Sequence, residues 1–308
     1  MNTPKHPGAP ISFREVTVRY PQSERDAVAD VTLAIPAGEF VVLLGPSGCG
    51  KSTLLRTVNR LIEPQRGAVS IDGTDVSTMD PTALRRSIGY VIQAVGLFSH
   101  MTVEQNIAVV PSLLGWNRAR IDERTDELLT LVELPPARYR KRFPRELSGG
   151  EQQRVGVARA IAAQPNVLLM DEPFGAVDAI VRTALQEETK RIARVLQTTI
   201  LFVTHDVDEA LRLADRIVIM QDGRLVQYGT PLEILTAPRT PYVTKLLDTH
   251  DVIRRLQLLS VEAAMQPALS SSTGAKTIDA GSTLREALND FLQGNSTLSV
   301  TREGTAIG

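Results

Sequence analysis

Cysteine is almost absent from this chain of 308 residues, in which Cys49 is the single example. One cysteine excludes an intramolecular disulfide and a metal cage built from several cysteines, and it is typical of a reducing compartment. Long hydrophobic runs are missing too, because the apolar stretches 40–44, 167–170 and 200–203 fall far short of the roughly 18 consecutive residues that suggest a membrane-spanning helix. Residues 1–10 are polar and rich in proline, so a secretory signal is not expected.

An excess of either charge is also lacking, since 34 basic residues stand against 35 acidic ones and leave a formal net charge of −1. The composition therefore predicts no overall electrostatic attraction to nucleic acid or anionic lipid. What is present is the make-up of an ordinary globular protein, with 43% hydrophobic and 22% charged residues and enough length for two domains. We expect a globular protein of the cytoplasm that contains no membrane span of its own.

Two kinds of strand are predicted from the spacing of apolar residues. Residues 11–20 and 31–35 alternate apolar with polar side chains, which predicts two half-buried antiparallel strands. Residues 39–44 contain an unbroken apolar run, which predicts a strand covered on both faces, as in a parallel sheet. Residues 167–170 and 200–203 repeat this run, each after a helical stretch, and strands that alternate with helices indicate an α/β domain.

Other segments complete the predicted organisation. Residues 103–132 lack strand signals and favour a helical subdomain, and residues 216–228 indicate a hairpin around an Asp-Gly turn. Residues 267–275 are dominated by Ser, Gly and Pro and are typical of a linker. Past it we expect a strand at 277–278, a helix at 284–292 capped by Ser282 or Thr283, and a strand at 298–301. The predicted domains are an ATPase domain at 11–248, a helical extension and linker at 249–276, and a short tail at 277–308.

A glycine-rich loop follows the first buried strand and precedes a helix-forming stretch, residues 53–61. It reads Gly45-Pro46-Ser47-Gly48-Cys49-Gly50-Lys51-Ser52 and fits the pattern G-x-x-x-x-G-K-[ST] in the structural context that this pattern requires. The glycines let successive N–H groups point at phosphate oxygens, and the dipole of the following helix adds positive potential. Lys51 is then placed to reach the β- and γ-phosphates, and the Ser52 hydroxyl to bind Mg²⁺.

Two acidic residues end a second buried strand. Asp171 and Glu172 follow the apolar run 167–170, at the end of the strand where open α/β sheets place their ligands. We expect Asp171 to hold Mg²⁺, directly or through water, and Glu172 to polarise the attacking water. Together with the glycine-rich loop, the pair predicts an enzyme that hydrolyses a nucleoside triphosphate.

A third motif indicates which kind of nucleotidase to expect. Residues 147–154 read Leu-Ser-Gly-Gly-Glu-Gln-Gln-Arg and resemble the LSGGQ signature of ABC ATPases, with Glu151 where Gln is commoner. The resemblance covers about residues 11–235 with every motif in register. It implies an α/β fold of the P-loop NTPase class, an ABC cassette with an antiparallel β subdomain and a helical subdomain. The short C-terminal α+β tail resembles a partial CBS motif.

The same resemblance implies roles for further residues. Tyr20 is similar to the aromatic residue that stacks on adenine, and Gln93 to the Q-loop glutamine that meets Mg²⁺ and the transmembrane partner. Residues 175–178 resemble the D-loop, and His205 the switch histidine that contacts the γ-phosphate. The implied ATP-binding residues are Tyr20, Gly45, Pro46, Ser47, Gly48, Cys49, Gly50, Lys51, Ser52, Thr53, Gln93, Ser148, Gly149, Gly150 and Asp178. The implied metal ligands are Ser52, Gln93 and Asp171, and the implied catalytic residues are Glu172 and His205.

In the family that this chain resembles, the signature loop faces the γ-phosphate bound by another subunit. The resemblance therefore implies that Ser148, Gly149 and Gly150 complete a site on a second copy, so that the working unit is a homodimer or a pair of cassettes around two ATP molecules. ATP binding would close this dimer and hydrolysis would release it, which gives partners a two-state element to respond to.

The segment 96–103, Gly-Leu-Phe-Ser-His-Met-Thr-Val, resembles the one that follows the Q-loop in solute importers, with Ser99 in place of the usual Pro. With residues 171–178 and the tail, it is most similar to ATPases that take up glycine betaine, choline and related osmoprotectants. This implies a peripheral subunit on the cytoplasmic face of the cell membrane, with transmembrane permease subunits as partners and an extracytoplasmic solute-binding protein as an indirect one.

Other classes of ABC ATPase remain as alternatives. The chain could serve a different imported solute, an exporter, DNA repair or translation. Repair enzymes insert coiled coils or zinc modules between the two nucleotide motifs, and here the interval from Lys51 to Asp171 contains no heptad run. Translation factors carry two cassettes per chain and many exporters fuse the cassette to membrane helices, and neither feature is found in this sequence.

Overall fold

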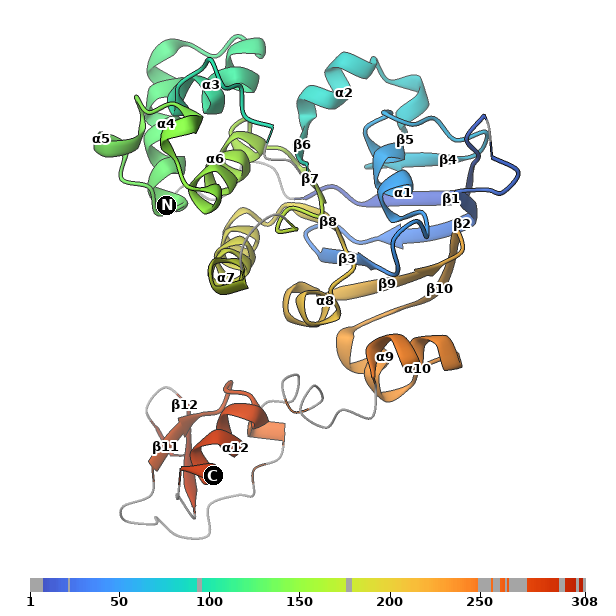
Figure 1. The fold of residues 1–308 in the computed structure, drawn as a ribbon, viewed down its shortest axis with the longest axis vertical. Helices are drawn as coiled ribbons and strands as arrows, with labels where there is room; N and C mark the ends of the chain where they lie inside the picture. Colours follow the sequence, from blue (N-terminus) through green and yellow to red (C-terminus); the bar gives the residue numbers. More distant parts are fainter. Residues whose placement is uncertain are drawn as a thin grey trace. The chain divides into compact units, whose positions relative to one another are not determined.

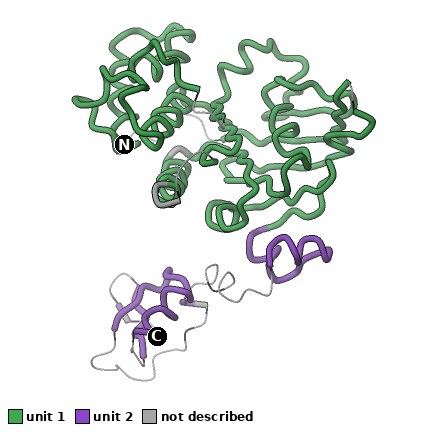
Figure 2. Tube along the Cα trace, viewed as in Figure 1, with its two compact units in different colours: residues 1–229 green, residues 230–308 purple. Residues whose placement is uncertain are grey.

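The computed structural model describes residues 8–21, 23–92, 96–175, 179–248, 256, 261–263, 265, 276–293, 297–302 and 305–306. These residues divide into two compact units, 1–229 and 230–308, which are coloured separately in Figure 2. Within the described ranges, no helix combines the length and the apolar content that crossing a membrane requires.

An antiparallel sheet of four strands forms one layer of the first unit, with the order β2-β1-β4-β5 (Figure 1). Its strands are β1 (Ile11–Val18), β2 (Val28–Ile35), β4 (Arg66–Ile71) and β5 (Thr74–Asp75). Ile11 on β1 lies opposite Ile35 on β2 and Ile71 on β4, and buried residues alternate with exposed ones along β2. The predicted antiparallel pair is thereby confirmed.

A second sheet of six strands, in the order β10-β9-β3-β8-β7-β6, carries the buried apolar runs. Its strands are β3 (Phe40–Leu44), β6 (Ile88–Val91), β7 (Val167–Asp171), β8 (Thr199–Thr204), β9 (Arg216–Gln221) and β10 (Arg224–Gly229). Every residue of β3, β7 and β8 is buried, and these strands run parallel to one another. Strands β9 and β10 pair antiparallel, as the hairpin prediction required.

Helices cover this sheet and connect it to the first one. These helices are α1 (Lys51–Val58), α2 (Pro81–Ser87), α7 (Ala179–Leu196) and α8 (Val207–Leu213). A 3₁₀ turn, η1 (Val76–Thr78), precedes α2. Helix α1 contacts strands of both sheets, and Leu54 and Leu55 on α1 belong to a core cluster that also includes Phe13 on β1 and Leu43 on β3. The phosphate-loop helix therefore lies in the core that joins the two sheets.

A lobe of helices lies beside the second sheet in Figure 1. It consists of α3 (Val103–Leu113), α4 (Arg118–Leu131), α5 (Pro136–Tyr139), the 3₁₀ turn η2 (Pro144–Glu146) and α6 (Gly149–Ile161). This lobe is the helical subdomain that residues 103–132 predict. Its α3 begins at a capping box in which Thr102 and Gln105 hydrogen-bond to each other's backbone, which satisfies two N–H groups of the helix start.

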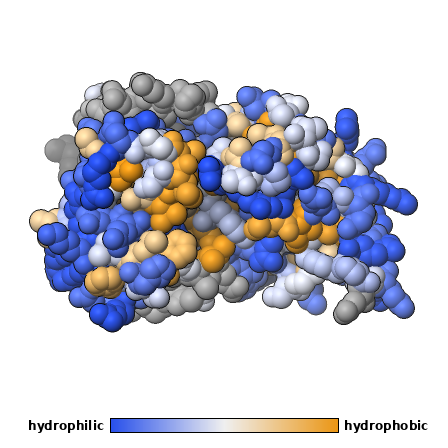
Figure 3. All heavy atoms as spheres, turned by 90° about the horizontal axis from the view of Figure 1, so that it is seen from above, coloured by the Kyte–Doolittle hydropathy of each residue, from blue (hydrophilic) through white to orange (hydrophobic). Residues whose placement is uncertain are grey.

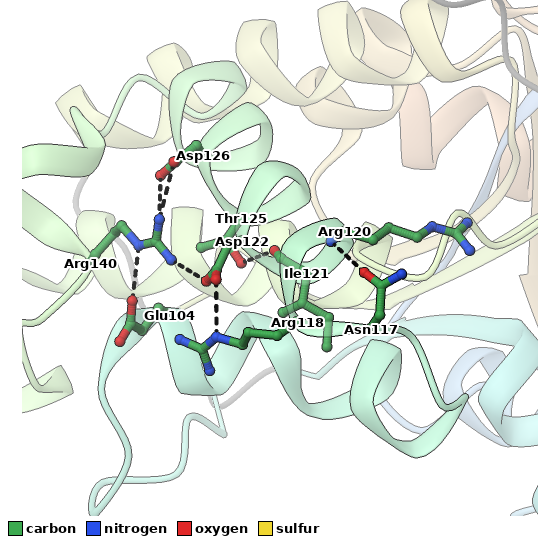
Figure 4. Close-up of polar contacts among 9 residues, drawn as sticks. All are labelled: Glu104, Asn117, Arg118, Arg120, Ile121, Asp122, Thr125, Asp126 and Arg140. Carbon is green, nitrogen blue, oxygen red and sulfur yellow. Dashed lines mark hydrogen bonds and ion pairs between the residues drawn. The ribbon is translucent and has the colours of Figure 1, made fainter.

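One arginine ties three segments of this lobe together (Figure 4). Arg140 donates to Glu104 on α3 at 2.9 Å, and to Asp122 and Asp126 on α4 at 2.6 and 3.1 Å. These carboxylates are partly exposed, so each pair taken singly stabilises the fold weakly, but their convergence on one guanidinium fixes the segment that leads to residues 147–150.

The second unit contains two short helices and a small α+β layer. Helices α9 (Pro231–Thr236) and α10 (Pro241–Leu247) come first, followed by the 3₁₀ turn η3 (Val261–Ala263), β11 (Lys276–Asp279), α12 (Leu284–Leu292), β12 (Leu298–Arg302) and β13 (Thr305–Ala306). Strands β11 and β12 are parallel, and Thr283 caps α12. The strand-helix-strand order of the tail is confirmed. The linker 267–275 lies outside the described residues, and the domain boundaries and the CBS likeness stay predictions.

Candidate nucleotide-binding site

The glycine-rich loop connects β3 to α1, at the carboxyl end of a central strand. Gly50, the residue before α1, has a φ of 100°, and a Cβ atom there would lie 2.1 Å from the carbonyl oxygen of Ala27. Only glycine tolerates both conditions. No side chain caps α1, so the N–H groups of its first turn are available to an anion.

Lys51 is buried, and its ammonium group is directed back over the loop. Its Nζ donates to the carbonyl oxygens of Gly45 at 2.8 Å and Pro46 at 2.9 Å, and lies 3.9 Å from the Cys49 sulfur. A lysine held in this way has its charge at the centre of the loop, where a bound phosphate group would exchange for the carbonyl oxygens. Around it Ser47 and Gly48 are exposed and Cys49 is buried.

Ser52 and Asp171, which are far apart in the sequence, meet at this loop. The Ser52 hydroxyl donates to Asp171 Oδ1 at 2.6 Å, because α1 and β7 present them at the same edge of the sheet. The side chain of Asp171 is only 6% exposed, and its Oδ2 accepts from Arg56 at 3.0 Å. A hydroxyl and a carboxylate oxygen are the hard oxygen ligands that Mg²⁺ prefers, so these two residues fit such an ion.

Glu172 and His205 also come together, from the ends of the neighbouring parallel strands β7 and β8. Glu172 Oε2 and His205 Nδ1 are 3.2 Å apart. Glu172 has a φ of 45°, in the left-handed region that non-glycine residues rarely occupy. Nine other described non-glycine residues share a positive φ, so the assignment of Glu172 rests on its contact with His205 and not on its backbone.

Tyr20 lies beside the first turn of α1. Its hydroxyl is 3.1 Å from the Thr53 hydroxyl, and its ring is among the exposed large hydrophobic groups of the chain. The two predicted nucleotide-binding residues Tyr20 and Thr53 are thus in contact, next to Ser52.

The signature loop is built separately, at the start of α6. Ser148 caps this helix and forms a capping box with Glu151, with Gly149 and Gly150 as the first helical residues. In the described part of the chain, no hydrogen bond joins Ser148, Gly149 or Gly150 to the phosphate loop. Gln93 and Asp178, the other two predicted site residues, lie outside the described residues.

Arg56 and Tyr90 were not recognised in the sequence as residues of the site. Arg56 follows Ser52 by one helical turn on α1, which places both on one face toward Asp171. Arg56 also hydrogen-bonds to Tyr90 on β6, whose pKa is raised because burial disfavours the phenolate. The spacing of four residues was the available signal for Arg56, but nothing in the sequence identifies Tyr90.

The chain is similar to proteins of known activity over most of its length. A family model described as ABC transporter matches residues 28–175. The carnitine transport ATP-binding protein OpuCA of Listeria monocytogenes is 47% identical over 299 residues, which are 96% of this chain and 73% of that protein. The glycine betaine uptake system ATP-binding protein YehX of Escherichia coli is 48% identical over 283 residues, which are 92% of this chain and 90% of that protein.

Two solved structures of ABC cassettes are also similar to this chain. The dimeric structure of MJ0796, described as a bacterial ABC transporter cassette, matches with a TM-score of 0.64 and 34% identity over 72% of this chain and 98% of that one. A second dimeric structure of MJ0796, in a post-hydrolysis state bound to ADP and Pi, matches with a TM-score of 0.64, 33% identity and the same coverage.

Proposed function

Because this chain belongs to the family of ABC transporter ATP-binding proteins, we propose that it drives the import of a quaternary ammonium osmoprotectant such as glycine betaine, carnitine or choline. It is an ABC ATPase, and the hydrolysis is coupled to transport by partner subunits. The observation that supports hydrolysis is the meeting of Ser52 with Asp171 and of Glu172 with His205 at the ends of parallel strands. The solute rests on the relatives, several of which carry these solutes in their names.

ATP binds, in this proposal, with its phosphates over the glycine-rich loop. Lys51 exchanges the carbonyl oxygens of Gly45 and Pro46 for phosphate oxygens, and the first N–H groups of α1 donate to the same phosphates. Ser52 and Asp171 would hold Mg²⁺, and the ion would supply positive charge beside the phosphates. No group of three or more acidic, His or Cys side chains among the described residues could hold a metal alone, which fits an ion that takes its other ligands from phosphate and water.

Hydrolysis requires a water molecule aimed at the γ-phosphate. Glu172 is the group placed to accept a proton from this water, and His205 Nδ1 is near enough to orient the Glu172 carboxylate. A positioned general base contributes about 10² to 10⁴ in rate.

A second copy completes the site in this proposal. The exposed Ser148 and the glycines after it lie at the positive end of α6, which suits them to a phosphate bound elsewhere. The dimeric state of a similar solved cassette supports the same arrangement.

A groove in the helical lobe is the proposed docking place for a membrane-spanning permease subunit. Between α3 and α4 lies a hollow of about 590 Å³ with apolar walls and charged residues at its edge, lined by His100, Met101, Glu104, Gln105, Ala108, Val109, Ser112, Leu113, Arg118, Ile121, Asp122 and Thr125. Phe98, close by in sequence, is 43% exposed. Figure 3 shows one face of the protein, on which apolar side chains gather between hydrophilic ones. We place the subunit at the cytoplasmic face of the membrane, where the extracytoplasmic binding protein reaches it only through the permease.

Transport assays test the solute and the coupling together. The chain would be purified with its permease subunits and reconstituted in vesicles with the ATPase subunit and ATP inside. Labelled glycine betaine, carnitine or choline would be added outside together with the solute-binding protein. ATP-dependent uptake of at least one of them, abolished by Lys51→Ala, is the expected result. The protein could instead hydrolyse ATP normally and take up an unrelated solute but none of these three. That result would refute the proposed substrate class and leave the assignment as an ATPase unchanged.

A further inference from the structure

One hydrogen bond connects helix α5 to the start of α6, and two more close the cap of α6 itself. The Tyr139 hydroxyl donates to Glu151 Oε1 at 2.6 Å, and the Ser148 N–H donates to Glu151 Oε2 at 2.7 Å. In return, the Glu151 N–H donates to the Ser148 hydroxyl oxygen at 3.3 Å. One carboxylate thus joins a buried tyrosine on α5 to the cap of α6, and both of its oxygens are in use.

These bonds determine which donors of the signature loop remain for an anion. The N–H groups of Ser148 and Glu151 already donate hydrogen bonds within the capping box. The N–H groups of Gly149 and Gly150 form no hydrogen bond with any residue in the described part of the chain. Two N–H groups on an exposed turn match the oxygens of a terminal phosphate.

The charge of Glu151 makes its restraint important. A carboxylate near the phosphate of a neighbouring copy would repel it if the side chain turned outward. Its hydrogen bonds with Tyr139 and Ser148 lower the pKa of Glu151, so the side chain is ionised at neutral pH and accepts charge-assisted bonds. Held inward, it also interacts favourably with the positive end of α6.

Tyr139 is itself firmly placed. Its ring is buried, and the guanidinium groups of Arg142 and Arg138 lie over it at 4.9 and 5.4 Å from the ring centroid. The hydroxyl therefore has a fixed position from which to hold Glu151, whereas a long carboxylate side chain alone has several rotamers at hand.

We propose that Tyr139 is a positioning residue for the composite ATP site: through Glu151 it fixes the turn at Ser148, so that Gly149 and Gly150 donate to the γ-phosphate of ATP bound by a second copy. This inference rests on the proposed function, because it requires that two copies enclose ATP. It adds a residue outside the signature motif that controls closure of the dimer and not the binding of ATP to one subunit.

Tyr139→Phe removes the hydroxyl and keeps the ring. In a Glu172→Gln protein, which binds ATP without turning it over, the MgATP concentration that gives half-maximal dimer by size-exclusion chromatography should rise about tenfold, on the order of one charge-assisted hydrogen bond. The affinity of one subunit for ATP, measured at protein concentrations below dimer formation, should not change. Tyr228→Phe is the matched control, because the Tyr228 hydroxyl on β10 is buried and has no hydrogen-bond partner among the residues that the structure describes.

A double-mutant comparison shows whether Tyr139 acts through Glu151. Glu151→Gln keeps the cap of α6 and removes the charge, and adding Tyr139→Phe to it should cost much less than Tyr139→Phe costs alone. Fully additive effects, or dimer formation by Tyr139→Phe at the parent's MgATP concentration, overturn the inference. If the Glu172→Gln parent itself stays monomeric in ATP, the composite site of the proposed function is refuted and this inference falls with it.

Discussion

Asp171 receives a hydrogen bond on each carboxylate oxygen, and the two donors differ in kind. Ser52 donates a neutral hydroxyl to Oδ1, and Arg56 brings a positive charge to Oδ2. Because the Asp171 side chain is only 6% exposed, its negative charge depends on this partner for compensation. The Arg56 side chain is 44% exposed, so the loss of hydration on folding is larger for Asp171 than for Arg56.

Replacing Arg56 tests this compensation. Arg56→Met should lower the unfolding free energy of the nucleotide-free protein by about 1 to 3 kcal/mol, because the buried charge of Asp171 loses its cation. The loss should be smaller in MgATP, where an ion at Ser52 and Asp171 supplies positive charge. Urea unfolding with and without MgATP measures both. Arg19→Met, which breaks an exposed pair with Asp26, is the control and should change stability little. An equal loss in both conditions contradicts the idea.

Cys49 gives a pH-dependent test of the glycine-rich loop. The thiol is 4% exposed, and burial raises its pKa above the ordinary value, so less thiolate is present at neutral pH than in an exposed cysteine. Alkylation by a maleimide should be slow at pH 7, accelerate as the pH rises toward this raised pKa, and be slowed by ATP. Mass spectrometry of the labelled chain gives the rate. Full ATPase activity after stoichiometric labelling of Cys49 would show that the loop tolerates the added group.

The roles of individual residues could be anticipated only where a motif fixes them. The pairing of Ser52 with Asp171 follows from two motifs at the ends of buried strands. Arg56 and Tyr139 could not be assigned, since each acts through a side chain whose position depends on the folded chain. Only the structure shows that Glu172 has a left-handed backbone, because φ is set by the turn after β7 and not by the residue type.

Helices α3 and α4 form both walls of the groove, and Arg140 braces them from the side. Its bonds to Glu104 on α3 and to Asp122 and Asp126 on α4 hold the helices at a fixed spacing (Figure 4). Because Glu104 and Asp122 also line the groove, the same carboxylates contribute to its shape and to the charge at its edge.

Phe98 tests the surface next to the groove as part of the proposed interface. Its ring is 43% exposed and lies near His100 and Arg159, so it contributes little to the core of the subunit. Phe98→Ala should leave the thermal unfolding of the isolated subunit nearly unchanged and weaken its co-purification with the permease. Ile107→Ala, at a buried position on α3, is the contrast and should destabilise the subunit itself by about 2 to 5 kcal/mol. If Phe98→Ala unfolds the isolated subunit, the residue belongs to its core and the docking proposal loses its support there.

Strands were predictable where burial determines the spacing of apolar residues. Strands β3, β7 and β8 are buried on both faces, and this burial is visible in the sequence as unbroken apolar runs. Strand β4 escaped prediction because Arg66–Ile71 is mostly exposed or half-buried and shows no alternation. Strand β6 has only four residues, and Gly89 within it lies so close to Ala160 that a Cβ atom would be 2.6 Å from its carbonyl oxygen.

At the scale of the whole molecule, the first unit contains every described residue of the site. The second unit has its own small core around Ile278 and Val300, with the helix α12 packed against a parallel strand pair. Its elements were predictable because the helix carries a capping sequence and the flanking strands, β11 and β12, contain β-branched residues. How a tail with so small a core contributes to function could not be inferred in the same way, because no motif with a defined chemistry lies in it.

The decisive test of the whole assembly is Glu172→Gln. This change removes the proton acceptor but keeps the shape of the side chain, so Lys51, Ser52 and Asp171 still hold MgATP. Hydrolysis should fall by about 10² to 10⁴ while nucleotide affinity changes little. Because ATP then persists, two copies should close on it through Ser148 and the glycines after it.

The observable is a stable dimer by size-exclusion chromatography in MgATP that is absent in MgADP. Lys51→Ala is the control: it removes the charge that sits over Gly45 and Pro46, and it should lose both nucleotide binding and the ATP-dependent dimer. His205→Ala should retain MgATP and slow hydrolysis. The variant lacks the imidazole that lies 3.2 Å from the Glu172 carboxylate, and no other described side chain is bonded to that carboxylate. Wild-type hydrolysis by Glu172→Gln would mean that another group activates the water, and the assignment of the acidic pair at the end of β7 would have to be reversed.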